Sequence, residues 1–378
     1  MGWTSTLRSV QPCFPLTPRR KTGSRDTMPR FISTTVLKRD VFSETHKGYF
    51  EDAPDVAVIR RIVSAAPWWS KPVAWKLARQ EIRALKAVKG IPGTPTLLMT
   101  DKDGLYRLWS DGTPLHLARP QDAFWYQDAR RLLHAMRRAG ITHNDIAKPQ
   151  NWLVLPDGSA GVIDFQLAKL HKRRGRLYRI MAYEDRRHLI KQKRSFAPHL
   201  LTPAERRILA RRSLPSRIWL MTGKKLYNAV TRGIFNWSDG EGTGDRIDLE
   251  GPSIIAALKR HPAVTDVALA VYPFPRKGTG LYAFAEAPDG VNTDDLAALQ
   301  GSHVKKGGAD LIQPVARLPR YADGTPRDDI LRLIAMNQMT ELEVLVAGDP
   351  DMAAIAAEIA AGRLNFTDRR ISSMEGRG

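Results

Sequence analysis

The chain has 378 residues and carries 59 Lys and Arg against 39 Asp and Glu, which gives a formal net charge of +20. This length suits two domains better than one small core. The lone cysteine, Cys13, excludes an intrachain disulfide and a thiolate metal site. No run of about eighteen apolar residues occurs, so the sequence predicts neither a transmembrane span nor a secretory signal.

The charge is distributed unevenly along the chain. Residues 1–239 hold 44 basic and 19 acidic side chains, whereas the remaining residues hold 15 and 20. This abrupt change indicates two separately evolved domains. A basic domain attracts phosphate-bearing partners such as a nucleotide, an anionic lipid, lipopolysaccharide or nucleic acid.

The first part of the chain predicts an alternation of strands and helices. Residues 1–30 are rich in Ser, Thr, Pro and Arg and are expected to form a disordered leader. Strands are expected over 35–50 and 55–63, and two short strands should meet at the Asp103–Gly104 turn. Helices are expected over 70–90 and 122–140, with Phe124, Ala129, Leu132, Leu133 and Met136 on the inner face of the second.

A cluster of polar residues follows in the stretch "THNDIAKPQNWLVLPDGSAGVIDFQLAK", residues 142–169. "NWLVL" and "AGVIDF" flank a turn sequence, and pairing them as an antiparallel hairpin places Asn151 beside Asp164. Two oxygen donors in that position suit Mg²⁺, which takes few protein ligands and completes its shell with phosphate and water. Asp145 precedes Asn151 on the incoming loop, where it can orient a hydroxyl nucleophile, and His143 is expected to support the loop. Taken singly, each of these residues also fits an ordinary turn, strand end or buried histidine.

The joint spacing resembles the catalytic centre of the bacterial protein-kinase-like superfamily, which is serine/threonine kinase-like and related to lipopolysaccharide kinases. There an H-R-D-x-x-x-x-N loop precedes a hairpin and D-F-G. "HNDIAKPQN" supplies His143, Asp145 and Asn151, and "DFQ" supplies Asp164. The loop has one extra residue, and Gln166 replaces the usual Gly. The resemblance implies an α+β fold with a two-lobed kinase-like domain over residues 31–238, with ATP and Mg²⁺ as cofactors.

The resemblance also assigns residues upstream. "VAVIRR" occupies the strand where the superfamily has a phosphate-binding Lys, and it places Arg60 there, with Glu81 as the helix partner that aligns the phosphates. The glycine-rich phosphate loop is nearly absent, because "VFSETHKGYF" contains only Gly48. A catalytically weak pseudokinase scaffold, which tethers a partner or a membrane surface, is therefore the alternative to an active kinase.

Basic residues alternate with apolar ones after the hairpin, over about 171–237. This pattern fits either a solvated basic face or a surface that binds an anionic membrane or glycolipid. Nucleic acid is the less favoured partner, since no known nucleic-acid motif accompanies the charge. The basic residues of interest are Lys172, Arg173, Arg174, Arg176, Lys191, Lys193 and Arg194, and the candidate interfacial apolar residues are Trp219, Leu220, Tyr227, Phe235 and Trp237.

The sign of the charge changes near a Gly- and Asp-rich stretch, and residues 239–246 are expected to form a linker. Residues 247–346 then read as a helix, two strands, a strand, a loop and a helix. The stretches "HPAV" and "LPRYADGTPRDDIL" resemble the small C-terminal domain of the adenylate-forming acyl-CoA synthetases. Thr325 stands where that superfamily has its catalytic Lys, so the resemblance implies a degenerate module without ligase chemistry. Residues 347–378 are expected to form a tail with a short helix.

The sequence therefore predicts a cytoplasmic ATP- and Mg²⁺-dependent phosphotransferase, peripheral at the inner membrane surface if the basic face binds lipid. In this hypothesis Asp145 is catalytic, Asn151 and Asp164 hold the metal, and Arg60 with Glu81 align the nucleotide. The acceptor is a hydroxyl on a protein Ser or Thr or on a lipid-linked sugar such as that of lipopolysaccharide.

Overall fold

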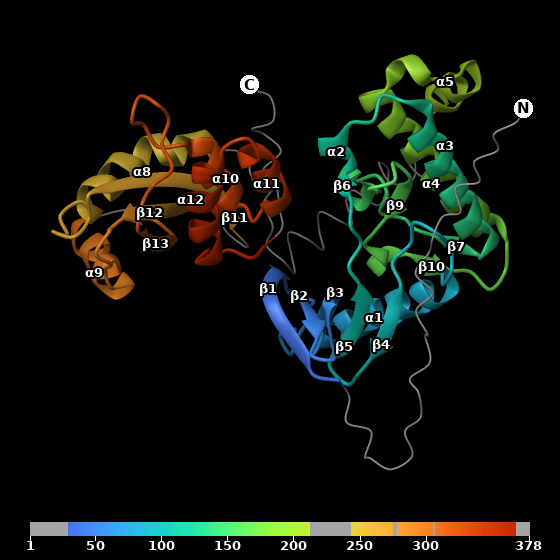
Figure 1. The fold of residues 1–378 in the computed structure, drawn as a ribbon, viewed down its shortest axis with the longest axis horizontal. Coiled ribbons are helices and arrows are strands. Elements are labelled where there is room, and N and C mark those ends of the chain that lie inside the picture. The colour runs from blue at the N-terminus through green and yellow to red at the C-terminus, as the bar shows by residue number, and fades with distance from the viewer. Residues whose placement is uncertain (1–28, 212–242, 275–277, 305–306, 368–378) are drawn as a thin grey trace, which may run out of the picture.

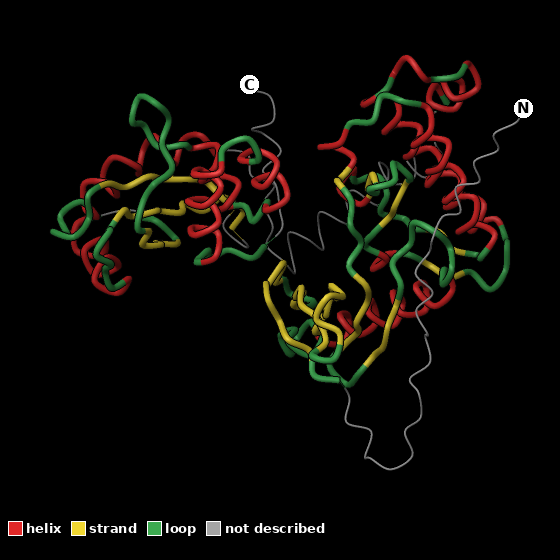
Figure 2. Tube along the Cα trace, viewed as in Figure 1, coloured by secondary structure: helices red, strands yellow, loops and turns green. Residues whose placement is uncertain are grey.

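The computed structural model describes residues 29–211, 243–274, 278–304 and 307–367. It is a mixed α+β fold, which confirms the predicted fold class (Figure 1, Figure 2). The leader residues 1–28 and the candidate interfacial residues Trp219, Leu220, Tyr227, Phe235 and Trp237 lie outside the described residues. Within them, every helix is too short or too polar to span a bilayer.

A five-stranded antiparallel sheet with one long helix forms the sheet region, residues 29–112. Its strands are arranged in the order β1-β2-β3-β5-β4. The helix α1 begins after Ser70, has proline in its first turn, and buries Ala74, Ala78, Glu81, Ala84 and Leu85. The bounds are β1 Phe31–Arg39, β2 Glu44–Phe50, β3 Ala53–Ile62, α1 Lys71–Ala87, β4 Leu97–Thr100 and β5 Gly104–Leu108.

A mainly helical region follows, residues 113–211. It shares one hydrophobic core with the sheet region, because Leu85 of α1 and Leu105 of β5 pack with Leu132 and Trp152. Its elements are β6 Thr113–Pro114, α2 Leu115–Ala118, α3 Ala123–Arg138, β7 Ile141–Thr142, η1 Pro149–Asn151, β8 Trp152–Val154, β9 Ala160–Val162, η2 Phe165–Leu167, β10 Lys169–Leu170, α4 Arg176–Phe196, η3 Pro198–Leu200 and α5 Pro203–Ala210.

Helix α3 confirms the predicted helix but not all of its predicted inner face. Asp122 caps it, since its carboxylate accepts hydrogen bonds from the backbone N–H groups of Phe124 and Trp125. The prediction that Phe124 faces inward is wrong, because its side chain is 57% exposed. Trp125 is buried instead and donates its indole N–H to the Leu153 carbonyl at 3.0 Å. Ala129, Leu132 and Met136 are buried as predicted, so the apolar stripe is kept and the difference is confined to the first turn, where Trp125 is buried in place of Phe124.

The C-terminal module, residues 243–367, has its own cores around a three-stranded sheet in the order β11-β12-β13. Helix α8 begins at Thr243, so the predicted linker over 239–246 is partly helical. Helix α12 buries Ala356, Ile359 and Ala360 in the module's core and is not a separate tail. The bounds are α8 Thr243–Leu258, β11 Asp266–Phe274, β12 Gly278–Glu286, α9 Thr293–His303, β13 Leu311–Val315, α10 Asp328–Ala335, α11 Met339–Val346 and α12 Pro350–Ala361.

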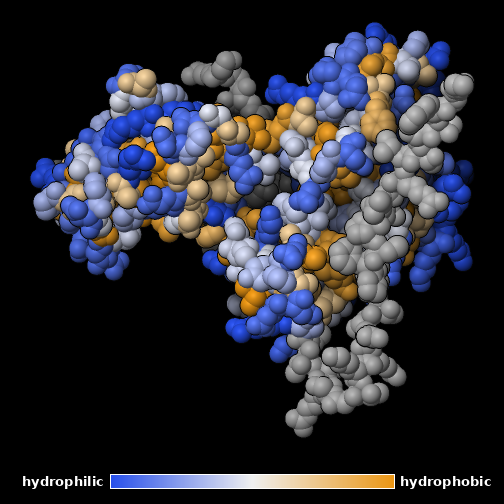
Figure 3. Space-filling view, in the orientation of Figure 1, coloured by the Kyte–Doolittle hydropathy of each residue, from blue (hydrophilic) through white to orange (hydrophobic). Residues whose placement is uncertain are grey.

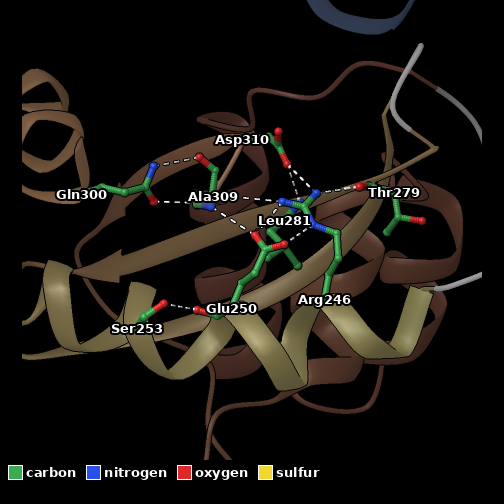
Figure 4. A network of polar contacts seen from close by, with 9 residues as sticks. Arg246, Glu250, Ser253, Thr279, Leu281, Gln300, Ala309 and Asp310 are labelled. Atoms are coloured by element: carbon green, nitrogen blue, oxygen red, sulfur yellow. Dashed lines mark hydrogen bonds and ion pairs between the residues drawn. The ribbon is translucent and has the colours of Figure 1, made fainter. Parts of the chain in front are cut away.

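A cluster of charges around Arg246 fixes α8 to the sheet of this module (Figure 4). Its guanidinium donates to both carboxylate oxygens of Glu250, at 2.9 and 2.8 Å. It also donates to the Thr279 carbonyl at 2.8 Å and to the Asp310 carboxylate at 3.1 Å. Because each charge has its partner within the chain, the cluster is a structural network.

The burial of Trp125 in place of Phe124 leads to a stability prediction. Trp125→Ala should lower the free energy of unfolding by about 3 to 5 kcal/mol, since it removes a buried ring and leaves the Leu153 carbonyl without its donor. Phe124→Ala should change it by about 0.5 kcal/mol or less, as expected for an exposed position. Urea unfolding followed by circular dichroism measures both variants, and equal losses would contradict the observed orientation of α3.

Candidate functional site

The hairpin formed by β8 and β9 brings Asn151 and Asp164 together, as predicted. Trp152 pairs with Val162 in the antiparallel register. Beyond that pair the backbone N–H of Ile163 donates to the carbonyl of Asn151 at 2.9 Å. The two candidate metal ligands therefore lie at the same end of the hairpin, away from the Asp157–Gly158 turn.

Asn151 is tied to Asp145 through its amide group. Its Nδ2 donates to the Asp145 carbonyl at 2.8 Å and to the Asp145 carboxylate at 3.1 Å. These bonds direct the nitrogen toward the loop. Within the described part of the chain, the amide oxygen Oδ1 accepts no hydrogen bond, so it is available to a cation.

Lys148 is a member of this cluster that the sequence analysis did not single out. Its Nζ donates to the Asp145 Oδ2 at 2.8 Å, and its side chain is 52% exposed. The same carboxylate thus meets an amide and an ammonium group. The signal was present in "HNDIAKPQN", where Lys148 is the only Lys or Arg, but the spacing alone did not show that it faces Asp145.

Asp164 has a left-handed backbone, with φ of 64° and ψ of 69°. This conformation is uncommon for a residue with a side chain and often marks a functional position. Its Oδ1 accepts a long hydrogen bond of 3.4 Å from the backbone N–H of Gln166. Its Oδ2 has no donor among the described residues. No cluster of three or more His, Cys, Asp or Glu side chains able to hold a metal ion occurs in the described ranges. The oxygen donors at this end of the hairpin are one carboxylate, of Asp164, and one amide, of Asn151.

His143 supports the loop from inside, in agreement with its expected role. Its ring is fully buried, lies edge-on to Phe165 with 4.8 Å between the ring centroids, and hydrogen bonds through Nε2 to the Ile163 carbonyl at 3.0 Å. Burial lowers the pKa of His143, so the ring is neutral near pH 7 and its Nε2 is the donor.

Asp185 of α4 anchors the same loop, and no sequence motif pointed to it. Its two carboxylate oxygens accept hydrogen bonds from the backbone N–H groups of His143, at 2.8 Å, and Asn144, at 3.0 Å. Asn144 has a positive φ of 66°, which turns its N–H toward the carboxylate. Burial raises the pKa of Asp185 to about 6, partly offset by these two hydrogen bonds. The residue lies about forty positions after the loop, beyond the reach of motif spacing.

Arg61 occupies the position expected for Arg60. Its guanidinium forms an ion pair with Glu81 of α1, and both side chains are almost fully buried. Its Nε donates to the Ser43 hydroxyl at 2.9 Å, whereas its Nη2 has no hydrogen-bond partner among the described residues. The prediction of an Arg60–Glu81 pair is therefore wrong by one residue. Successive side chains of a strand point to opposite faces of the sheet, so this shift moves the cation to the other side.

Arg60 faces away from Glu81. It lies 3.6 Å from the Asp101 carboxylate and 3.7 Å from that of Asp103, and its guanidinium stacks over the Tyr106 ring at 5.2 Å. Burial, with a hydrogen bond to Asp101, raises the pKa of Tyr106 to about 12. This arrangement supports the β4–β5 turn and leaves Arg60 outside the cluster around Asp145.

A cavity of about 910 Å³ adjoins the site. Its lining includes Lys47 of β2, Arg107 of β5, the connection 109–112, Leu153 of β8 and Ile163, which immediately precedes Asp164. Arg107 lies near Glu81 and Asp164, which oppose the lowering of its pKa by burial. The Lys47 ammonium lies 4.3 Å from the centre of the Trp109 ring. The lining carries three cations, Lys47, Arg107 and Arg363, and two carboxylates, Asp111 and Glu343, among mostly apolar residues.

The basic surface after the hairpin is smaller than predicted. Lys172, Arg173, Arg174 and Arg176 are exposed. Lys193 instead forms an ion pair of 3.0 Å with Glu205 and has a side chain only 13% exposed. It is therefore used in packing α4 against α5.

Thr325 lies in the exposed turn that precedes α10. Its hydroxyl donates to the Asp323 carboxylate at 2.6 Å, and its backbone N–H donates to the same oxygen at 2.9 Å. The side chain at this position is uncharged and used within its own turn. The loop thus lacks the cation that the acyl-CoA synthetase resemblance would require.

Comparison with known proteins gives similarity in the C-terminal part of the chain. No protein-family profile matches the chain. Acetyl-coenzyme A synthetase of Bartonella quintana is 32% identical over 119 residues, which is 30% of this chain and 18% of that protein. Acetyl-coenzyme A synthetase 2 of Pseudomonas putida is 34% identical over 104 residues, 26% of this chain and 16% of that protein. The chain spans less than a fifth of these relatives, which are enzymes by name. The kinase-like resemblance of the first part stays a prediction.

The one-residue shift predicts different effects for two adjacent arginines. Arg61→Met should lower the free energy of unfolding by about 3 to 5 kcal/mol, because it leaves the Glu81 carboxylate buried without its partner. Arg60→Met should cost about 1 kcal/mol or less, since its ion pairs are partly exposed. Denaturant unfolding compares the two, and a greater loss for Arg60→Met would return the pairing with Glu81 to that residue.

The buried carboxylate of Asp185 predicts a pH dependence. Its folded-state pKa of about 6 lies above the ordinary 3.8, so the folded chain binds this proton more tightly than the unfolded chain. Its contribution to stability is therefore greatest below the ordinary pKa and falls as pH rises toward 6, by roughly 3 kcal/mol.

The difference in unfolding free energy between the wild type and Asp185→Asn measures this contribution from pH 3.5 to pH 7. The wild type should lose stability relative to the variant as the pH rises through that range, and parallel curves would contradict the prediction.

Proposed function

We propose that this protein is a phosphotransferase that moves the γ-phosphate of ATP to a hydroxyl acceptor. The observation that carries the proposal is the contact set of the Asp145 carboxylate with Lys148 and Asn151, beside Asp164 at the same hairpin end. Transfer of a phosphoryl group depends mainly on positioning and on stabilising charge, and these residue types supply both.

The residues at the hairpin end fit a magnesium ion. The Asn151 amide oxygen and the second oxygen of Asp164 lack partners among the described residues, and hard cations prefer such oxygen ligands. Bound with the nucleotide, Mg²⁺ would neutralise charge on the β- and γ-phosphates. The relatives of the C-terminal module do not bear on this site, because their similarity lies elsewhere in the chain.

Asp145 is the residue proposed to act on the acceptor. A carboxylate at hydrogen-bond distance from a hydroxyl group orients it and accepts its proton. Asn151 fixes the carboxylate, and Lys148 keeps a positive charge 2.8 Å from it. The ammonium of Lys148 forms an ion pair with this carboxylate and is exposed enough to meet a transferred phosphoryl group.

Arg61 and Glu81 are proposed to align the nucleotide, in the role first assigned to Arg60 and Glu81. The free Nη2 of Arg61 is a buried donor that lacks a partner among the described residues, and a phosphate oxygen would satisfy it. A second candidate function is a pseudokinase scaffold. The β1–β2 turn favours this alternative, because it contains no glycine-rich loop to hold phosphates. Its Ser43 hydroxyl instead accepts a hydrogen bond from the Arg61 Nε.

The acceptor is proposed to be a protein Ser or Thr or a lipid-linked sugar. The exposed basic residues Lys172, Arg173, Arg174 and Arg176 support an acidic or membrane-bound acceptor, since charges of one sign attract the opposite charge over about a Debye length. Acyl adenylation is not proposed, because Thr325 is uncharged where the synthetase resemblance places a Lys, and its hydroxyl is bonded within its own turn.

A transfer assay with γ-labelled ATP and the purified chain tests the proposal, with casein as protein acceptor and lipopolysaccharide as glycolipid acceptor. Label should reach an acceptor in the presence of Mg²⁺, and Asp145→Asn should reduce the rate at least a hundredfold, the scale of a positioned general base. Asp164→Ala should abolish the Mg²⁺-dependent part of ATP binding.

Asp157→Ala is the matched control, because this carboxylate lies at the opposite end of the same hairpin and hydrogen bonds only within its own turn, to Ser159. It should retain both activity and binding. ATP binding without transfer to any acceptor, unchanged by Asp145→Asn, would favour the scaffold. A chain that binds no ATP with Mg²⁺ would disprove the proposed function.

A further inference from the structure

The C-terminal module contacts the sheet region along the free edge of β1. Asn337 donates through Nδ2 to the Leu37 carbonyl at 2.8 Å, and Arg363 donates through Nη2 to the Val36 carbonyl at 2.5 Å. In the reverse direction, the backbone N–H of Arg39 donates to the Phe366 carbonyl at 3.0 Å. Since β1 is an edge strand, these bonds satisfy backbone groups that the sheet leaves open.

Buried polar side chains hold this contact in one geometry. Asn337 and Arg363 are each only 6% exposed, and the Arg363 Nε donates to the Asn337 Oδ1 at 2.7 Å. A second contact joins α2 to α11, where His116 and Glu341 lie 2.8 Å apart. A buried network whose members are mutually satisfied specifies a single arrangement of the two parts. Figure 3 shows hydrophobic residues on the visible face near this junction.

The docked module forms the second wall of the cavity beside the candidate site. Opposite Lys47, Trp109 and Leu153, the lining comes from α11 and α12. On α12 the lining positions are small, at Ala353, Ala356, Ala357, Ala360 and Ala361. α11 contributes the larger lining side chains Met339, Leu342 and Val346, and side chains of that size along α12 would fill the cavity. This face instead leaves about 910 Å³ open, which lies within the usual range of about 300 to 1,000 Å³ for ligand pockets.

We propose that the nucleotide site is shared between the two parts, with the alanine face of α12 as the wall against which the base and ribose of ATP pack. The cations Lys47 and Arg107 line the opposite wall, where they favour a polyphosphate. Arg363 adds a third cation, so the cations of the lining outnumber its two carboxylates, Asp111 and Glu343. The inference rests on the proposed function and deepens it. The docked module then covers the nucleotide in place of a glycine-rich loop, which the β1–β2 turn does not carry, and nucleotide binding and docking reinforce each other.

The test compares two substitutions on one helix by titrating the full chain with ATP and Mg²⁺ in a calorimeter. Ala357→Trp places an indole ring in the cavity and should raise the Kd for ATP at least tenfold. Ala354→Trp is the matched control, because Ala354 is exposed and is not among the cavity-lining residues. It should bind ATP as the wild type does. Equal affinity in the two variants would overturn the inference.

A second variant alters the docking contact outside the cavity. Asn337→Gly with Glu341→Ala removes the bonds to Leu37 and His116, and glycine accepts the left-handed backbone at position 337, where φ is 56°. The Kd for ATP should rise at least tenfold. A lower or unchanged Kd would show that the module shields the cavity or is unrelated to it, and would overturn the inference. A wild-type chain that binds no ATP overturns the proposed function itself, which separates the two failures.

Discussion

A single buried carboxylate holds the candidate catalytic loop in place. The Asp185 carboxylate accepts hydrogen bonds from the backbone N–H groups of both His143 and Asn144. The left-handed conformation of Asn144 allows these two successive donors to point at one side chain. Asp145 follows directly, so its direction is set by this anchor. The loop then returns to β8, where Asn151 bonds back to Asp145. Orientation of the cluster thus depends on α4, an element that contributes no residue to it.

The second constraint is the ion pair of Arg61 with Glu81, which joins the sheet to α1 through a nearly water-free contact. A buried pair of this kind gains little net stability, because desolvation offsets much of the attraction. The pair instead contributes specificity, since a shift of one residue along β3 decides which arginine lies beside Glu81. It also leaves one buried donor of Arg61 without a partner among the described residues, which is the kind of group that a bound anion satisfies.

The C-terminal module contributes one wall of the cavity beside the candidate site. Considered by itself, its similarity to part of acetyl-coenzyme A synthetases says little about function, because it covers under a fifth of those proteins. The position of the module in the structure is more informative about its role. Hydrogen bonds along β1 and an alanine-lined helix face place it against the same cavity that the candidate site adjoins. Thr325 is uncharged and bonded within its own turn, and the contacts along β1 give the module a structural role.

The sequence by itself determined the features that depend on neighbours in the chain: the α+β class, helices α1 and α3, the β8–β9 hairpin, and the closeness of Asn151 to Asp164. Turn residues and short-range periodicity encode such features directly. Tertiary structure decided which face each element buries and what meets across long separations. Trp125 replaced Phe124 in the core and Arg61 replaced Arg60 beside Glu81, because local periodicity leaves a one-residue ambiguity that only packing against a partner resolves. Asp185 lies more than forty positions after the loop that it anchors, and the α12 residues that line the cavity lie about two hundred positions after it. No local sequence pattern predicts contacts over such separations.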